Sequence, residues 1–597
     1  MVETQTHRLE KGVLAAGFVA LAVGVAAAHA SPATGYELSI YRATPTLFWG
    51  GVGVALVSGV GVARSSTDWR RCLALLLGGG ATLAVVALPL LRGYYFMGPG
   101  QSLTHLGWAK DVATGRMAAS ELLYPGTHAV GVVLSDATGL PLRDGLLLAV
   151  VAFALTYLCF VPLTVRAVTG DRRATTFAAL AGLLLLPVDG IGVFNLVHPT
   201  SQAILFVPLL VYLAAKYVTN AGASRVPPFG SAAGCLLALS SVALVLVHPQ
   251  QAVNAALLFG GVAAVQFAYR RFSGGHAIAR HRPLYGQTAF LLVAVLAWTP
   301  RHVRSAGSPR TLAVRLVTNT PTASDAGLSQ IGGSLQGLFL KVFLVSAVLG
   351  ALAVAFVLAG LFGRVRDTDA STFTKYLAVG LVPLSVLFVV FLGTSNPQFH
   401  FRVLGFVMVP LTMLAGVAIA RGLDLVEARA TDGEAVSRSV SAAVLVLLAL
   451  SVPTLYHSPY TYQASGQVTE ATMTGYATAF DHRGDVRFGG LRSTTERYAD
   501  GVLGYERSRR TDVTGTEVYG NAANATGENF TAGRVARSYD GPRNLPLTTA
   551  TRQRELAVFD GLRFPARGFR TLSSSPAVSR VQSCGGFQLY HLNGSER

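Results

Sequence analysis

The chain has 597 residues, of which 51% are hydrophobic and only 13% are charged. Soluble proteins carry a charge at about a quarter of their positions, so this composition excludes an ordinary soluble enzyme and predicts an all-α polytopic membrane bundle. The formal charge of +18 does not imply a nucleic-acid partner, because the basic residues are scattered between apolar stretches, as the positive-inside rule expects.

Apolar stretches long enough to cross a bilayer occupy the chain from Gly12 to Tyr456. We predict about 13 membrane-spanning helices, near residues 12–30, 47–63, 72–91, 145–165, 176–188, 202–218, 232–248, 252–269, 287–300, 337–362, 376–393, 402–420 and 441–456. The stretches at 176–188 and 287–300 are short and contain Pro187 and Pro300, and losing one of them would reverse the orientation of every later helix.

The placement of arginine predicts which side each loop faces. Arginines gather in the loops at 64–71, 166–173, 270–282, 364–366 and 421–438, whereas the loops at 189–201 and 248–251 hold neither lysine nor arginine. This alternation predicts a multi-pass protein of the cell membrane with a cytoplasmic amino terminus and an extracytoplasmic carboxyl-terminal part. A second interpretation of residues 12–30 is a secretory signal cleaved after Ala30.

The chain divides into three predicted parts: an N-terminal hairpin (1–71), a membrane domain (72–456) with outer loops at 92–144 and 301–336, and a soluble extracytoplasmic domain (457–597). In the last part, residues 581–584 and 587–590 read as two strands around a Gly-Gly turn, so we expect a small α/β domain. Residues 501–550 are expected to be rich in loops. Acceptor sequons at Asn524, Asn529 and Asn593 are candidate glycosylation sites and favour the outer side.

The outer loop at 92–144 holds the best candidate site. Helical spacing puts Gln101, His105 and Trp108 on one face, Asp111 follows Trp108 by about one turn, and His128 comes later in the loop. One interpretation is an amphipathic helix that presents these groups to a sugar ring and its lipid carrier. The other is an interfacial helix whose aromatic residues only anchor at the headgroups.

A second signal is a short internal sequence repeat. Leu-Val-His-Pro occurs at 196–199 and again at 246–249, each time at the outer start of a predicted helix. A histidine at membrane depth is costly unless it is paired or faces a polar cavity, so His198 and His248 favour one outward cavity, with Asp189 just before it. The alternative is two helix starts with interfacial histidines.

A third signal is positive charge on the side where it is disfavoured. Arg301 and Arg304 lie in one outer loop, and His400 and Arg402 lie at another outer helix end. Guanidinium groups bind phosphate through paired hydrogen bonds, so a lipid-linked phosphate explains this pattern. Anionic headgroups, or an error in the predicted topology, explain it as well.

Other chemistries gain no support from the sequence. It contains no phosphate-binding glycine loop and no nucleophile elbow, and the histidines lack metal-ligand spacing. Cys584 is the only cysteine in the carboxyl-terminal part, which excludes a disulfide within that part.

The outer loop resembles that of the GT-C class, polytopic glycosyltransferases that use polyprenyl-phosphate-linked sugars. Ala109, Gly115 and Tyr124-Pro125 follow the order of the family pattern, and the resemblance covers roughly residues 70–300. The chain is also similar to a group of multi-span proteins of halophilic archaea. Gln101 stands where such enzymes usually carry the catalytic aspartate, and a glutamine cannot accept a proton.

The resemblance implies a transferase that moves a sugar from a polyprenyl-phosphate donor to an outward-facing glycan, lipid or protein. Asp111 is then the general base, with His105 as a second catalytic residue. The residues that bind the substrate are Gln101, Trp108, His128, Asp189, His198, His248, Arg301, Arg304, His400 and Arg402. Inverting transfer implies no redox cofactor, and a divalent metal is left open. The alternative is a non-catalytic carrier or scaffold for lipid-linked glycans. The sugar, the acceptor and the oligomeric state are not specified by the sequence.

Overall fold

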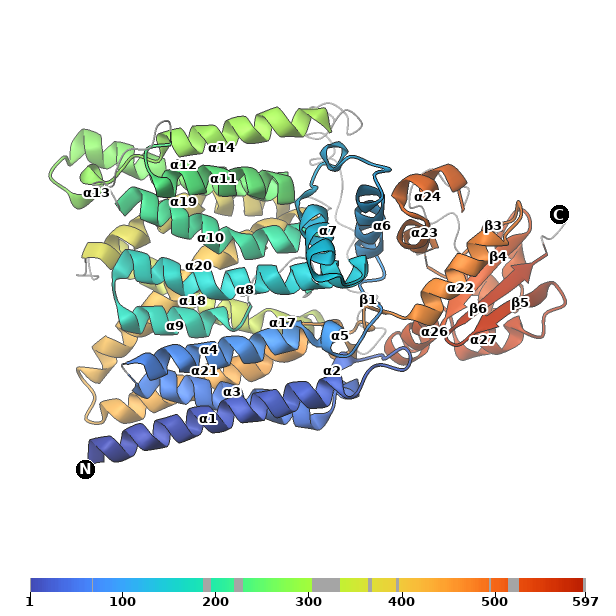
Figure 1. Ribbon diagram of the computed structural model, residues 1–597, viewed down its shortest axis with the longest axis horizontal. Helices are drawn as coiled ribbons and strands as arrows, with labels where there is room; N and C mark the ends of the chain where they lie inside the picture. The colour runs from blue at the N-terminus through green and yellow to red at the C-terminus, as the bar shows by residue number, and fades with distance from the viewer. Residues whose placement is uncertain are drawn as a thin grey trace.

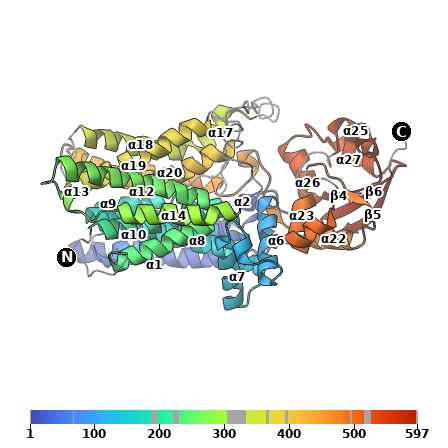
Figure 2. The same ribbon diagram turned by 90° about the horizontal axis from the view of Figure 1, so that it is seen from above.

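The computed structural model describes residues 2–66, 68–185, 195–219, 229–302, 333–362, 368–392, 397–492, 495–513 and 525–593. Long helices run side by side along one axis and form a bundle, and a smaller α/β part follows at one end of it (Figure 1). Short helices and loops fill the junction between the two parts, as the view from above also shows (Figure 2).

Each of the thirteen predicted stretches overlaps helical residues in the described part of the chain. The helices of the bundle are α1 (Val2–His29), α3 (Thr46–Ser65), α4 (Trp69–Val86), α5 (Leu88–Leu91), α8 (Leu142–Thr169), α9 (Arg172–Gly182), α10 (Pro199–Thr219), α11 (Ala232–Val247), α12 (Pro249–Phe272), α14 (Tyr285–Trp298), α17 (Leu335–Val342), α18 (Leu344–Leu361), α19 (Thr368–Leu392), α20 (Pro397–Glu427) and α21 (Gly433–Ser451). The predicted polytopic helical bundle is therefore confirmed.

Fewer helices than predicted are long enough to cross a membrane. Among the described residues, ten helices are both long and apolar enough to cross a membrane, and Ala232–Val247 is a shorter apolar helix. Helices α9 and α14 have 11 and 14 residues, which at about 1.5 Å per residue fall short of a hydrocarbon core of about 30 Å. These are the two stretches whose prolines made the sequence prediction weakest.

Several predicted boundaries were wrong for local reasons. The stretch 72–91 is divided at Ala87 into α4 and α5, with Pro89 in the first turn of α5. The stretch 337–362 is divided at Phe343 into α17 and α18. Helix α20 continues to Glu427, beyond the predicted end at residue 420, because its last turns carry charged residues that pair with α9.

The amino terminus and the carboxyl-terminal part lie at opposite ends of the bundle (Figure 1). Helix α1 packs along α3, and the two backbones approach so closely that a Cβ on Gly51 would collide with the carbonyl oxygen of Ala20. Such small-residue contacts are the usual way for membrane helices to pack. Helix α1 is thus an integral member of the bundle in this structure.

The first outer loop forms α6 (Gln101–Ala113), a 3-10 turn at Ala119–Glu121 and α7 (Gly126–Thr138). These elements lie across the end of the bundle that faces the carboxyl-terminal part (Figure 1). The predicted helix beginning at Gln101 is confirmed. It does not lie on a free membrane surface, because α23 and α24 of the carboxyl-terminal part cover it.

The carboxyl-terminal part contains a four-stranded sheet in the order β3-β4-β6-β5, in which β3 and β4 are parallel and the other pairs are antiparallel. Its elements are α22 (Glu470–Asp481), β3 (Arg487–Phe488), α23 (Thr495–Leu503), α24 (Tyr505–Thr511), α25 (Gly527–Thr531), β4 (Arg543–Thr548), α26 (Thr549–Gln553), a π-helical turn (Arg554–Val558), α27 (Ala566–Leu572), β5 (Val578–Cys584) and β6 (Phe587–Leu592).

The predicted hairpin around Gly585-Gly586 is present as β5 and β6. The expectation that residues 501–550 are mostly loop was wrong for the described part of that range, which contains α24, α25 and β4. One hydrophobic core runs from the bundle through α22 and α23 to the near face of the sheet, and a second core lies behind the sheet around Phe530, Phe564 and Leu592. The continuous first core joins the two parts of the molecule.

Candidate functional site

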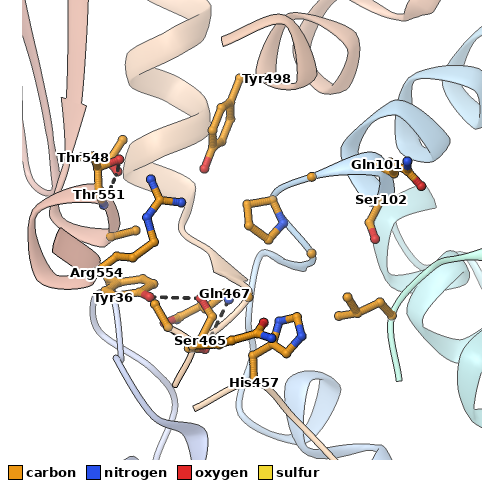
Figure 3. A pocket seen from close by; sticks show the side chains of 18 of the residues that line it. Tyr36, Gln101, Ser102, His457, Ser465, Gln467, Tyr498, Thr548, Thr551 and Arg554 are labelled. Atoms are coloured by element: carbon orange, nitrogen blue, oxygen red, sulfur yellow. Dashed lines mark hydrogen bonds between the residues drawn. The ribbon is translucent and has the colours of Figure 1, made fainter. Parts of the chain in front are cut away.

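A cavity of about 720 Å³ lies where the end of the bundle meets the carboxyl-terminal part (Figure 3). Its walls come from segments far apart in the sequence: Tyr36, residues 98–102, Leu196 and His198, Arg402, His457, residues 463–467, Tyr498, and five residues near the end of the chain, Thr548, Ala550, Thr551, Arg554 and Phe559. Pockets that bind small molecules are usually concave sites of this size with a few polar groups.

The floor of the cavity is built from three crossing segments. Strand β1 (Phe96–Met97) pairs with β2 (Gln467–Val468), and the next amide, on Gly98, donates to the carbonyl of Gly466 at 2.6 Å. The side chain of Gln467 holds the first segment by accepting from the amide of Glu37 at 2.6 Å and donating to the carbonyl of Gly35 at 3.0 Å. This network fixes the loop that leads into α6.

Gln101 and His198 meet at the membrane side of the cavity. Gln101 is the first residue of α6, and its Oε1 lies 3.2 Å from Nε2 of His198, which directly precedes α10. Proline at position 199 begins α10, a position where its missing amide costs nothing. Both side chains line the cavity, which brings together two of the predicted substrate-binding residues.

Behind His198 lies a buried layer of aromatic rings. His105 and His128 share a hydrogen bond of 3.0 Å, and the ring of His105 lies 6.1 Å from that of His198. His248 accepts from or donates to the hydroxyl of Thr200 at 3.0 Å and stacks on Tyr124. The two Leu-Val-His-Pro segments therefore do converge, but only His198 reaches the cavity.

Burial keeps this layer uncharged. Loss of hydration lowers the pKa of His105 well below its usual value and lowers that of His128 to about 4, although backbone hydrogen bonds near Tyr124 and Pro125 raise the latter. His457, which lines the cavity after the last helix of the bundle, has its pKa lowered by burial to about 4 as well. These imidazoles are neutral near pH 7.

Two arginines bring positive charge to the cavity from different parts of the molecule. Arg402, near the start of α20, lies 3.3 Å from Oε1 of Gln250 and lines the membrane side. Arg554, in the carboxyl-terminal part, points into the cavity beside Tyr498 (Figure 3). Among the described residues that line the cavity there is no aspartate or glutamate. The site is therefore suited to an anionic ligand.

Asp111, predicted as the general base, lies away from the cavity. Its side chain is fully buried, its Oδ2 accepts from the amide of Glu506 at 2.8 Å, and it does not line the cavity. The left-handed backbone at Gly504 lets the segment approach, since a Cβ there would collide with Oδ1 of Asp111. Asp111 lies ten residues after Gln101, about 80° from it around the axis of α6, and it faces α24, so it ties the two parts of the molecule together.

The ring of Trp108 contacts other aromatic rings of the protein. Its ring lies 5.1 Å from that of Tyr505 in α24 and 5.7 Å from that of His128. Both neighbours belong to the protein, so the residue packs between the bundle and the carboxyl-terminal part. His105, predicted as catalytic, is likewise enclosed and does not line the cavity.

The remaining predicted residues either lie away from the cavity or fall outside the described residues. Arg301 is exposed after α14, and His400 packs on Phe388 and Phe401, so neither lines the cavity. Asp189, Arg304 and Asn524 lie outside the described residues. Of the sequons, Asn593 is exposed, whereas Asn529 is half-buried at the start of α25 and its neighbour Phe530 is buried in the second core.

Several residues that line the cavity could not be predicted from the sequence. Tyr36, Tyr498, Thr548 and Arg554 belong to no motif, and they meet only through tertiary contacts. His457 had a weak signal, since it follows the last apolar stretch directly and is followed by Ser458-Pro459. Within the described part of the chain, no group of three or more His, Cys, Asp or Glu residues is arranged to hold a metal ion.

The position of the cavity bears on the carrier hypothesis. A carrier needs a path through the bundle that opens to both sides. A second, smaller cavity of about 80 Å³ is lined by residues such as His281, Asp369 and Tyr376, and it shares no lining residue with the first. In the described residues the arrangement is thus a one-sided site and gives the carrier hypothesis no support.

No family model and no curated protein matches the sequence. The structure is similar to ArnT from Cupriavidus metallidurans bound to undecaprenyl phosphate, with 14% identity, a TM-score of 0.45, and coverage of 87% of this chain and 99% of that one. It is also similar to the archaeal oligosaccharyltransferase AglB from Archaeoglobus fulgidus in complex with an inhibitory peptide and a dolichol-phosphate, with 10% identity, a TM-score of 0.48, and coverage of 87% and 74%.

Proposed function

We propose that this protein is a membrane glycosyltransferase that moves a sugar from a polyprenyl-phosphate donor to an outward-facing acceptor, with the cavity as its active site. The observation that carries the proposal is a positively charged cavity at one end of a membrane bundle, without a described carboxylate in its walls. A lipid phosphate can reach such a site from the bilayer while its sugar projects toward the carboxyl-terminal part.

Arg402 is the group that binds the phosphate in this proposal. It stands at the start of α20, where the bundle ends and the cavity begins. During transfer the bond between the anomeric carbon and the phosphate oxygen breaks, and the electron pair stays on the leaving phosphate. A fixed guanidinium stabilises this developing charge better than water does, because it is already oriented.

His198 is the base. The hydroxyl oxygen of the acceptor forms the new bond to the anomeric carbon, and its proton passes to the imidazole of His198. Gln101 orients that ring through the contact of 3.2 Å. This pairing replaces Asp111 as the proposed base and gives Gln101 a role that requires no proton acceptance. The proposed side of the reaction is the outside of the cell membrane, where the sequence pattern puts this end of the bundle.

The test uses a deletion strain and mass analysis of its surface glycans. The wild-type gene and the control His482→Gln, an exposed histidine outside the cavity, should restore one missing sugar. His198→Gln should leave it missing, since loss of a positioned base lowers rates by about 10²–10⁴-fold. Full restoration by His198→Gln would contradict the proposal. A complete lipid-linked glycan accumulating on the inner face would instead identify a carrier.

A further inference from the structure

The wall of the cavity that belongs to the carboxyl-terminal part contains the guanidinium of Arg554, whose carboxylate neighbour is already bound by another arginine. Glu555, fully buried, already binds Arg492 through two hydrogen bonds of 2.5 and 3.0 Å. Arg554 touches the same carboxylate only through Nε, at 3.4 Å. Two arginines thus share one carboxylate, and Arg554 contributes a positive charge at this place.

That positive charge faces the cavity. The side chain of Arg554 is 24% exposed, and it points into the space beside the ring of Tyr498 (Figure 3). Tyr498 lines the cavity together with Thr548 and Thr551, whose hydroxyls share a hydrogen bond of 3.0 Å, and Tyr36 lines it from the segment between α1 and α2. Aromatic rings and hydroxyls are the usual neighbours of a sugar in a binding site, and a guanidinium among them selects an oxyanion.

Arg554 is also separate from the proposed phosphate site. Arg402 comes from the start of α20 in the bundle, whereas Arg554 comes from the turn that follows α26. One phosphate accounts for one of these cations and leaves the other available.

We propose that Arg554 recognises a second negative charge, a carboxylate on a sugar of the substrate, so that the transferase acts on uronic-acid-type glycans. This inference rests on the proposed function and names its substrate class. The carboxylate belongs either to the sugar on the donor lipid or to the acceptor glycan. Both sources present the same chemistry to Arg554, and a binding experiment separates them.

The experiment measures binding to the purified full-length protein in nanodiscs, with no need for catalysis. The probes are undecaprenyl phosphate, methyl glucuronide and methyl glucoside. Wild type should bind the glucuronide about tenfold more tightly than the glucoside, since an ionic hydrogen bond contributes at least that factor. Arg554→Gln should abolish the difference, Arg554→Lys should restore part of it, and Arg552→Gln, an exposed neighbour outside the cavity, should preserve it.

A second arm locates the charge. If undecaprenyl-phosphate-linked glucuronate binds about tenfold more tightly than the glucose analogue in an Arg554-dependent way, the carboxylate is on the donor. If the glucuronate lipid and the glucose lipid bind with equal affinity, and binding of free methyl glucuronide still depends on Arg554, the carboxylate is on the acceptor. If neither glucuronate probe depends on Arg554, the inference is wrong. If the wild-type protein binds the glucuronide but does not bind undecaprenyl phosphate, the proposed function is contradicted and this inference is not.

Discussion

At the scale of single residues, the site depends on which face of a helix a side chain occupies. Gln101 and Asp111 both belong to α6, yet Gln101 lines the cavity and Asp111 is sealed against α24. The helical period was read correctly from the sequence, and it grouped Gln101 with His105 and Trp108. What the sequence did not reveal is that α23 and α24 pack on α6, which gives Asp111 a structural partner.

Asp111→Asn tests this division of roles. The amide oxygen of asparagine can still accept from the amide of Glu506, so the expected result is sugar transfer within a factor of about three of wild type. Asp111→Ala, which leaves that buried amide unpaired, should lower the stability of the protein by about 1–3 kcal/mol. Melting curves and transfer assays on the same preparations provide the measurement. Loss of transfer in a stable Asp111→Asn protein would restore Asp111 as the base.

The buried imidazoles predict how stability depends on pH. The pKa of His128 is about 4 in the folded protein against an ordinary value of 6.5, so the unfolded chain binds a proton that the folded chain does not as the pH falls between these values. Stability is therefore complete above pH 6.5 and decreases toward pH 4 by up to about 3 kcal/mol from this residue. Burial of His105 acts in the same direction.

Melting temperatures recorded between pH 7 and pH 4 check this prediction. The slope for His128→Gln should be smaller than for wild type, whereas His482→Gln, whose side chain is exposed, should not change it. Equal slopes for wild type and His128→Gln would show that the buried layer does not govern acid stability.

At the scale of elements, the junction between α6 and α23 decides whether the cavity exists. Asp500 of α23 is fully buried, accepts from the hydroxyl of Thr104 at 2.6 Å, and binds Arg509 at 2.7 Å. The Cα of Gly107 faces the carbonyl of Asp500, and a Cβ there would collide with it. These contacts hold the carboxyl-terminal wall of the cavity against the outer loop.

Asp500→Ala should loosen that junction. The substitution leaves Thr104 and Arg509 without their carboxylate, with an expected cost of roughly 2–3 kcal/mol. Proteolysis should then cleave between the bundle and the carboxyl-terminal part sooner than in wild type. Asp485→Ala, at an exposed site, is the matched control. Unchanged protection in Asp500→Ala would mean that the hydrophobic core alone maintains the junction.

The elements of the bundle could be predicted because long apolar stretches are a strong and local signal. The strands β1 and β2 could not be predicted. Each has only two residues, and the paired residues Phe96 and Val468 are about 370 positions apart in the chain. Tyr36 and Arg554 could not be predicted either, because they lie far apart in the sequence and meet only in the folded protein. The hairpin of β5 and β6 was predictable, because its turn is a local Gly-Gly pair.

At the scale of the whole molecule, the two ends of the bundle differ in what they carry. The amino terminus lies at one end, and the cavity with the carboxyl-terminal part lies at the other (Figure 1). An odd number of crossings has this result. Ten helices of the described residues are long and apolar enough to cross a membrane, so the thirteen predicted spans stay a prediction. The arginine pattern then predicts that the cavity opens outside the cell.

The central claim is that the cavity between the bundle and the carboxyl-terminal part binds a polyprenyl phosphate. The most direct measurement is photocrosslinking of the full-length protein with a photoreactive undecaprenyl phosphate, followed by peptide mapping. The account predicts labels on the cavity segments around Leu196, Arg402 and Gln463, with labelling reduced in Arg402→Gln and unchanged in Arg301→Gln. Labels concentrated instead around His281 and Tyr376, at the smaller cavity, or labels indifferent to Arg402, would contradict it.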